Sequence, residues 1–384
     1  MPELPTPRSL SGPLVWSEQS LRNKDEELYK LKLTSNEISD INTSLEHFKA
    51  LELDLDQVSP ATFPLGGLAR QLQNVAQSVH GGLGFTVIQG LDMAQYSIKD
   101  SVIIFLGIAS HIADKRGYQD TKGNILAHIT NSKLWNVPME KRHGIHSNKA
   151  LPPDSSSLPC HQPFHNDMGC DILALQARHG TCAGGCICLS SAWTAYNRLL
   201  DDEPDVLQTL LAPNWPVQIS GHHSRYYLAP ALAMHGGKLM TSLDPNRFGR
   251  HAASTHADIP DLTTGQRHAL ERLFDVAMQA EVRLKLETGS FLFLNNWAIL
   301  HRRDAYEDDE STSRHMVRLW LRNSQLGWAI PTRMLPPWLA AYGDGLQRAS
   351  PIYALHPLTT YIAPKYSAGS AAFVMEDSDE SDGE

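Results

Sequence analysis

The stretch GSFLFLNNWAILH, residues 289–301, combines a run of large apolar side chains with a tight turn and a single histidine. The apolar run after Gly289 predicts a strand buried on both faces, since a half-exposed strand would alternate with polar residues. Asn295 and Asn296 favour a tight turn, and the short apolar piece behind them presents His301 at its end. Taken alone, His301 fits a hydrogen-bonded core histidine as well as it fits a metal ligand.

The stretch RHMVRLWLR, residues 314–322, alternates between two kinds of side chain. Neighbouring residues of a strand point to opposite faces, so one face is predicted to be core: Val317, Leu319 and Leu321. Arg314 and Arg318 share the other face. Guanidinium groups inside a barrel are costly unless anions meet them, and a guanidinium offers a carboxylate paired hydrogen bonds. The segment therefore predicts a carboxylate-binding strand, with an amphipathic edge strand as the alternative.

A third motif, Phe164-His165-Asn166-Asp167, lies well upstream. In extended backbone, residues two apart point to the same side, so His165 and Asp167 can meet at one point. A histidine and a carboxylate that meet in this way supply two of the three ligands of the facial triad in non-haem Fe(II) oxygenases. The tripeptide alone is equally typical of a surface loop.

Short segments rich in β-branched and aromatic residues predict further strands. The candidate strands are 170–177, 184–191, 216–220, 226–234, 238–242, 282–287, 290–295 and 314–322. Helical periodicity predicts helices from Thr34, over 68–79, from Ser97 to a stop at Lys115-Arg116-Gly117, at about 192–211 and at about 263–280. Many short strands with few helices favour a mainly β protein with flanking helices, a double-stranded β-helix of the jelly-roll, cupin-like type.

The chain has 384 residues, and its patterns predict three parts. An irregular N-terminal arm covers 1–33. A single domain covers 34–355, with its β-helix core at about 84–322. A C-terminal extension over 356–384 ends in an acidic tail, which its composition predicts to be disordered.

Charge and composition exclude several classes of protein. The net charge is −9, and six of the acidic residues stand in the last nine positions, so the remainder is close to neutral. Without a basic stripe, nucleic acid is not an expected partner. The longest apolar stretch, 102–113, is far short of the roughly 20 residues that a membrane span needs. Five cysteines bunched in one region, with no secretory signal at the N-terminus, favour a reducing, cytoplasmic location.

The order of these motifs resembles that of one enzyme group. The chain is similar to the taurine dioxygenase (TauD/TfdA)/clavaminate synthase-like superfamily of Fe(II)- and 2-oxoglutarate-dependent dioxygenases, specifically its fungal branch. The resemblance covers about 12–330 and rests on residues 12–16, 102–107, 164–176, 190–193, 196–197, 212–216, 295–301 and 314–322.

The resemblance implies a role for each candidate residue. His165, Asp167 and His301 would bind Fe(II), and Arg314 would bind the distal carboxylate of 2-oxoglutarate. Arg318 would help to bind the cosubstrate or would meet an acidic group on the substrate. With O2, such a site oxidises a small organic substrate by hydroxylation, desaturation or ring closure, and releases succinate and CO2. Neither the substrate nor the oligomeric state follows from the sequence.

One position departs from the family. Relatives usually follow the glycine pair with an acid and then a Ser or Thr, whose hydroxyl helps to bind 2-oxoglutarate, whereas this chain has Gly184-Gly185-Cys186-Ile187. A neutral hydrogen bond contributes about 1 kcal/mol, so Ile187 predicts weaker cosubstrate binding. Ile187 also supports an alternative function, that of a pseudoenzyme that binds metal or ligand without turnover. A zinc hydrolase with the same three ligands is a further alternative function.

The loop 152–162, directly before the metal motif, is either a lid over the substrate or an insertion.

Overall fold

The computed structural model describes residues 8–22, 26–120, 122–130, 163–180, 183–218, 226–250, 258–304, 306–307, 314–344 and 349–357. The loop 152–162, which the sequence predicts to be either a lid or an insertion, and the acidic tail lie outside these residues. The predicted domain boundaries stay predictions.

Two main sheets form the centre of the molecule. The larger follows the order β1 (Lys30–Lys32), β2 (Phe85–Gln89), β13 (Phe291–Asn295), β5 (Ile172–His179), β16 (His315–Arg322) and β3 (Lys115–Gly117), and β4 (Leu126–Thr130) also pairs with β16. The smaller has the order β12 (Val282–Leu284), β7 (Ile187–Ser191) and β14 (Ile299–Arg303). Both are antiparallel apart from the parallel pair β1 and β2. Mainly antiparallel strands in facing sheets confirm the predicted jelly roll.

Three further pairs of strands form separate two-stranded sheets. They are β8 (Trp215–Gln218) with β9 (Tyr226–Ala229), β10 (Leu232–His235) with β11 (Lys238–Thr241), and β6 (Ala183–Gly184) with β15 (Tyr306–Glu307).

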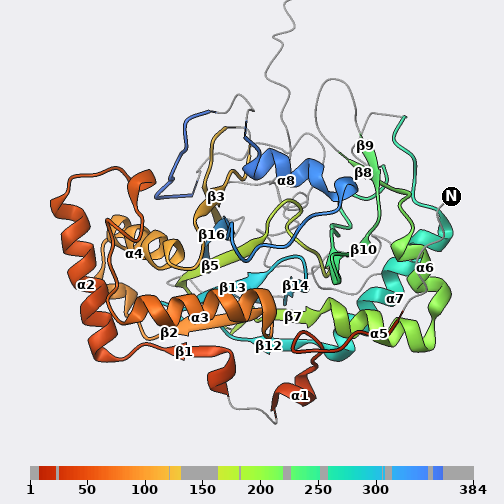
Figure 1. Cartoon of the computed structure of the whole chain (residues 1–384), viewed down its shortest axis with the longest axis horizontal. Coiled ribbons are helices and arrows are strands. Elements are labelled where there is room, and N and C mark those ends of the chain that lie inside the picture. The colour runs from red at the N-terminus through yellow and green to blue at the C-terminus, as the bar shows by residue number, and fades with distance from the viewer. Residues whose placement is uncertain are drawn as a thin grey trace, which may run out of the picture.

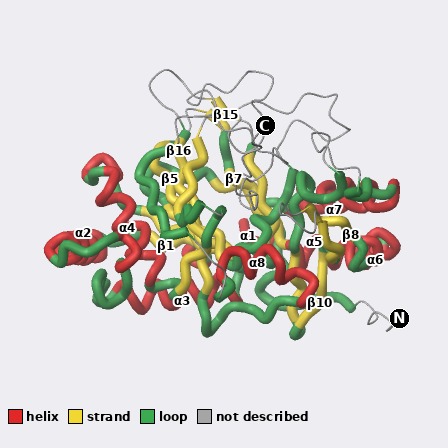
Figure 2. The backbone as a smooth tube through the Cα atoms, turned by 90° about the horizontal axis from the view of Figure 1, so that it is seen from above, coloured by secondary structure: helices red, strands yellow, loops and turns green. Residues whose placement is uncertain are grey.

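The helices gather at two ends of the sheets, as Figures 1 and 2 show. At one end lie α2 (Ser35–Ala50), α3 (Leu68–Gly81) and α4 (Ile98–Ser110), and α3 packs on β2 and β13. At the other end lie α5 (Ala192–Asp202), α6 (Pro204–Leu211) and α7 (Thr264–Ala280), with α5 and α7 against β7. The shorter α8 (Leu335–Tyr342) contacts β3, and α1 (Glu18–Arg22) lies near the N-terminus. Short 3-10 turns occupy Glu26–Leu28, Leu55–Gln57, Met93–Gln95 and Thr332–Met334.

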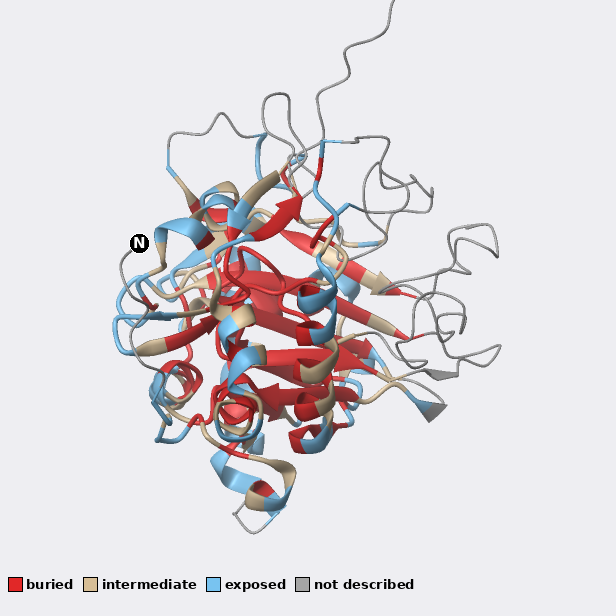
Figure 3. Cartoon of the chain, turned by 90° about the vertical axis from the view of Figure 1, so that its right-hand side faces the viewer, coloured by how far each residue is buried: buried red, intermediate tan, exposed pale blue. Residues whose placement is uncertain are grey.

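The larger sheet separates two hydrophobic cores, and its central strands β13, β5 and β16 are almost wholly buried (Figure 3). One face of β5 and β16 packs toward the helices α2, α3 and α4, through Ile172, Ala174, Val317, Leu319 and Leu321. The opposite face packs into the second core, through Leu173, Leu175, Met316 and Trp320. Because alternation along β16 places its arginines on this second face, they point between the two sheets.

Two predicted elements end earlier than expected. The helix that begins at Ser97 stops at Ser110, and residues 115–117 form the edge strand β3, where the sequence predicted a helix stop. The helix predicted over 192–211 is two helices, α5 and α6, joined at Glu203 before Pro204. Proline lacks an N–H and disfavours helical backbone in the residue before it, so the chain turns there.

The predicted strand 226–234 is likewise two strands, β9 and β10. Pro230 stands between them and cannot donate a ladder hydrogen bond. By contrast, the start of α2 agrees with prediction: Thr34 and Glu37 form a capping box at its N-terminus. None of the described helices is both long and apolar enough to cross a membrane.

Candidate metal centre

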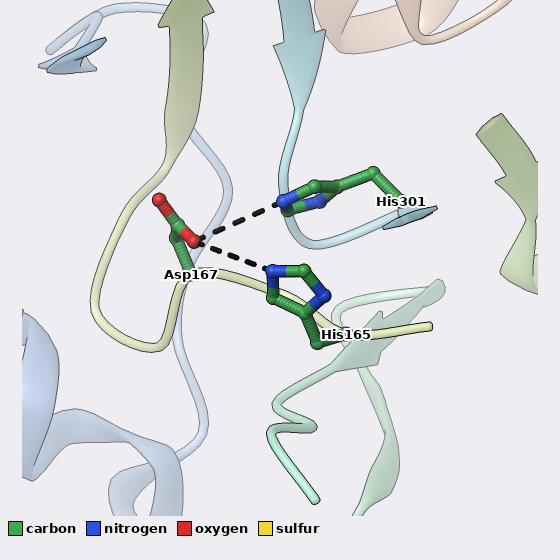
Figure 4. A group of neighbouring side chains, drawn as sticks. All are labelled: His165, Asp167 and His301. Atoms are coloured by element: carbon green, nitrogen blue, oxygen red, sulfur yellow. Dashed lines mark ion pairs between the residues drawn. The ribbon is translucent and has the colours of Figure 1, made fainter. Parts of the chain in front are cut away.

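Two segments distant in the sequence bring three potential ligands together. His165 and His301 form an isolated antiparallel bridge, in which each backbone N–H donates to the other residue's carbonyl at 3.0 Å. Their imidazole rings lie 4.3 Å apart between centroids. Asp167, two residues after His165, turns its carboxylate toward both rings, as Figure 4 shows.

The distances fit a shared metal ion. Asp167 Oδ1 lies 4.0 Å from His165 Nε2 and 3.8 Å from His301 Nε2, too far for hydrogen bonds. Two metal–ligand bonds of roughly 2.0–2.2 Å span at most about 4.4 Å, so one ion between these atoms reaches both. All three residues are buried, and no other such cluster of His, Cys, Asp or Glu occurs among the described residues. Two imidazoles and one carboxylate are a donor set suited to Fe(II).

The second oxygen of Asp167 is held from the other side. Its Oδ2 forms an ion pair with Arg318 Nη1 and accepts a hydrogen bond from Trp320 Nε1, both at 2.9 Å. Burial alone raises the pKa of Asp167, but the charge of Arg318, the two histidines and the hydrogen bond from Trp320 outweigh it and hold that pKa below its usual value. The carboxylate is therefore ionised and oriented, with Oδ1 toward the histidines. The sequence did not indicate either contact.

His301 is held in the neutral form that metal binding requires. Burial, followed by the nearby His165, lowers the pKa of His301 to about 3. Its Nδ1 is buried and has no hydrogen-bond partner among the residues that the structure describes, whereas Nε2 faces Asp167. The lone pair on Nε2 is thus available at neutral pH.

Two asparagines lock the ligand-bearing segments to each other. The side chain of Asn296 accepts from the backbone N–H of Asp167 at 2.9 Å and donates to the carbonyls of Asp167 at 2.7 Å and Cys170 at 2.8 Å. Asn166 donates to the carbonyls of Asn296 at 2.6 Å and Ile299 at 3.1 Å. Asn296, the second residue of the predicted tight turn, therefore also joins the Asp167 segment to the one before His301.

A cavity opens beside the three ligands, between the two main sheets. Its space, with the solvent at its open mouth included, is about 430 Å³, and it is lined by Ile129, His165, Asp167, Leu173, Leu175, Ile187, His301, Arg302, Arg303, Arg314 and Arg318. The five candidate residues from the sequence thus all line one cavity. Arg318 is already engaged there, since its Nε donates to Gln119 Oε1 at 2.7 Å while its Nη1 binds Asp167. Arg303 is an additional cationic residue, and its place two residues after His301 on a strand was the available signal.

Comparison with known proteins agrees with this geometry. The family described as "Taurine catabolism dioxygenase TauD, TfdA family" matches residues 49–320. The chain is 27% identical to the taurine hydroxylase-like protein SAT17 of Stachybotrys chartarum over 91% of this chain and 89% of that protein. It is 22% identical to the FR-33289 synthase of Streptomyces rubellomurinus over 85% of this chain and 94% of that protein.

Solved structures share the fold. An asparagine oxygenase in complex with Fe(II), 3-hydroxyasparagine and succinate matches with a TM-score of 0.58 and 14% identity, over 78% of this chain and 98% of that one. The non-heme iron oxygenase OrfP in complex with Fe and alpha-ketoglutaric acid matches with a TM-score of 0.56 and 16% identity, over 77% of this chain and 94% of that one.

Proposed function

This chain belongs to the taurine catabolism dioxygenase TauD, TfdA family, and from that premise we propose that it uses Fe(II), 2-oxoglutarate and O2 to oxidise a small organic substrate. His165, Asp167 and His301 are the proposed metal ligands. The products are a hydroxylated or desaturated compound together with succinate and CO2. The bound iron supplies O2 activation and C–H oxidation, chemistry that protein side chains do not provide.

One observation carries this proposal: the three ligands and the buried arginines line the same cavity. A metal site alone would also suit a zinc hydrolase. Hydrolysis needs no dicarboxylate cosubstrate, however, so it gives no reason for buried guanidinium groups beside the metal ligands. A metal-dependent oxidation driven by 2-oxoglutarate accounts for both the metal ligands and the buried arginines.

The protein's part is to bind and orient the cosubstrate and the metal ligands, and to exclude water from the site. Arg314 is the proposed partner of the distal carboxylate of 2-oxoglutarate, because its planar fork can donate two parallel hydrogen bonds to it. Arg318 is assigned a positioning role: its contacts to Asp167 and Gln119 use two of its three nitrogens. Apolar walls keep bulk water from the reacting groups, and they are formed by Ile129, Leu173, Leu175 and Ile187.

The substrate is proposed to be a small molecule, with amino acids as the first class to test. Solved relatives of this fold are described with 3-hydroxyasparagine and with L-Arg bound. We also propose a reducing, cytoplasmic setting, because the described cysteines Cys170, Cys186 and Cys188 are free thiols.

The test is spectroscopic and then chemical. Fe(II) and 2-oxoglutarate are added without oxygen, and the visible charge-transfer band of the chelated cosubstrate is recorded. Oxygen is then admitted with candidate substrates, and succinate is measured. A dioxygenase shows the band and the succinate, and Asp167→Ala abolishes both. A band without succinate from any substrate would indicate a ligand-binding pseudoenzyme, and the absence of both signals would defeat the proposal.

A further inference from the structure

We propose that Arg303 is a second guanidinium for 2-oxoglutarate, which meets the distal carboxylate together with Arg314 from the opposite sheet. The inference rests on the proposed function and adds a binding residue to that site. Arg314 lies directly before β16 of the larger sheet and Arg303 ends β14 of the smaller one. Both line the cavity beside the metal ligands.

The alternation of β14 places Arg303 on the side of the cavity. His301 and Arg303 are two residues apart on one strand, so they point to the same face, and that face holds the metal ligands. Arg302 also lines the cavity, and it forms ion pairs with Glu281 at 2.6 Å and with Asp304 at 2.8 Å. Of the two adjacent arginines, Arg303 is the one that shares its strand face with the metal ligand His301.

Arg303 stands directly across from Ile187 in the antiparallel pair of β14 and β7. Ile187 is 4% exposed and lines the same cavity, but its side chain offers no hydrogen-bond donor. A ligand carboxylate at this wall therefore finds its donor on the neighbouring strand. The guanidinium of Arg303 supplies a charged donor at a place where Ile187 supplies none.

Arg303 is one of four arginines that line the cavity, with Arg302, Arg314 and Arg318. Arg303 is 8% exposed, and its Nη1 donates to the backbone carbonyl of Asp304 at 3.4 Å. A guanidinium that lines a cavity can donate charge-assisted hydrogen bonds to a carboxylate, and 2-oxoglutarate brings two carboxylates. If one lies at the metal, the other can reach the arginines.

The experiment compares two ligands by calorimetry, with Zn(II) in place of Fe(II) so that no turnover occurs. The ligands are 2-oxoglutarate and 2-oxopentanoate, which has the same carbon chain without the distal carboxylate. In Arg303→Met, the Kd for 2-oxoglutarate should rise roughly ten- to a hundredfold, as expected for a charge-assisted hydrogen bond. The Kd for 2-oxopentanoate should change little, and Arg303→Lys should fall between wild type and Arg303→Met.

Two further variants serve as a control and as a rescue of 2-oxoglutarate binding. Arg283→Met is the matched control, because the largely exposed Arg283 contacts Glu281 and Asp304 from outside the cavity; it should leave both Kd values unchanged. Ile187→Thr adds the hydroxyl that the wall lacks. It should recover part of the lost affinity in Arg303→Met, and should gain less when Arg303 is present.

The outcomes are distinct. If wild type binds 2-oxoglutarate and Arg303→Met binds it equally well, the inference fails while the proposed function stands. Equal losses for both ligands, or a loss confined to substrate affinity, would also overturn it, because the distal carboxylate would then not be the partner of Arg303. If metal-loaded wild type does not bind 2-oxoglutarate at all, the proposed function fails and the inference fails with it.

Discussion

Replacing Arg318 by Met tests whether this residue positions the metal ligand Asp167. The substitution keeps the length and apolar stem of the side chain but removes the 2.9 Å ion pair, whose two side chains are 4% and 1% exposed. Removing one partner of a buried pair leaves the other charge uncompensated, which typically costs about 3–5 kcal/mol of unfolding free energy. The surface pair Arg272–Glu203, with side chains 33% and 27% exposed, should cost about 0–1 kcal/mol when Arg272 becomes Met.

Metal affinity should also fall in Arg318→Met, and the size of the fall should depend on pH. Burial raises the pKa of Asp167 and Arg318 is the largest influence that opposes it, so the pKa should rise in Arg318→Met. A ligand must be deprotonated to bind metal. The variant should therefore lose metal affinity by roughly ten- to a hundredfold at neutral pH. The ratio of wild-type to variant affinity should grow further as the pH falls from about 7 to 5, because protons then compete for Asp167 in the variant.

The assay is Fe(II) or Zn(II) titration followed by calorimetry across that pH range, with urea unfolding of the metal-free proteins alongside. Arg318→Lys retains the charge and should recover most of the affinity and its pH dependence. A variant that loses stability but binds metal with wild-type affinity at every pH would refute the positioning role, because a merely structural contact predicts that result.

Three other variants test neighbouring features. Trp320→Phe removes the N–H that binds Asp167 and should weaken metal binding several-fold, less than Arg318→Met does; an unchanged Kd would contradict this. Asn296→Ala removes the partner of three buried backbone groups. It should lower the unfolding free energy by about 3 kcal/mol or more in urea titrations. A loss under about 1 kcal/mol would argue against the role of Asn296 in joining the two segments. Burial holds the pKa of His128 at about 4 and that of His315 at about 3, so the unfolded chain binds more protons below pH ~6.5. Stability should then fall by up to about 1.4 kcal/mol per pH unit for each histidine as pH drops from about 6.5 to 4, and His128→Asn should flatten this slope; a wild-type profile that is already flat would count against it.

Local patterns predicted much of the fold and of the candidate site. Because side chains alternate along extended backbone, His165 and Asp167 share one face, and so do Arg314 and Arg318, independently of the neighbouring strands. The capping box at Thr34 depends only on residues three apart. These features were available from the sequence because each depends on backbone geometry over a few residues.

Some errors came from competing local signals. The helix that begins at Ser97 was predicted to run to residues 115–117, but those residues are needed at the edge of the larger sheet, where they pair with β16. Tertiary pairing outweighs helix propensity in such segments, since propensity differences are only about 1 kcal/mol per residue or less. Pro204 and Pro230 divided two predicted elements, and a stricter use of their missing N–H groups would have found both breaks.

The sequence by itself determined that a histidine and an aspartate share one side of an extended segment, that His301 follows a buried strand, and that arginines share one face of another. It also predicted a jelly roll. Only the tertiary structure decided that the Oδ2 of Asp167 meets Arg318 and Trp320, that Asn296 joins the ligand segments, and that Arg303 faces Ile187. Those contacts depend on which strands become neighbours and in what register. Distant segments acquire that arrangement only when both cores pack, because no local period encodes it.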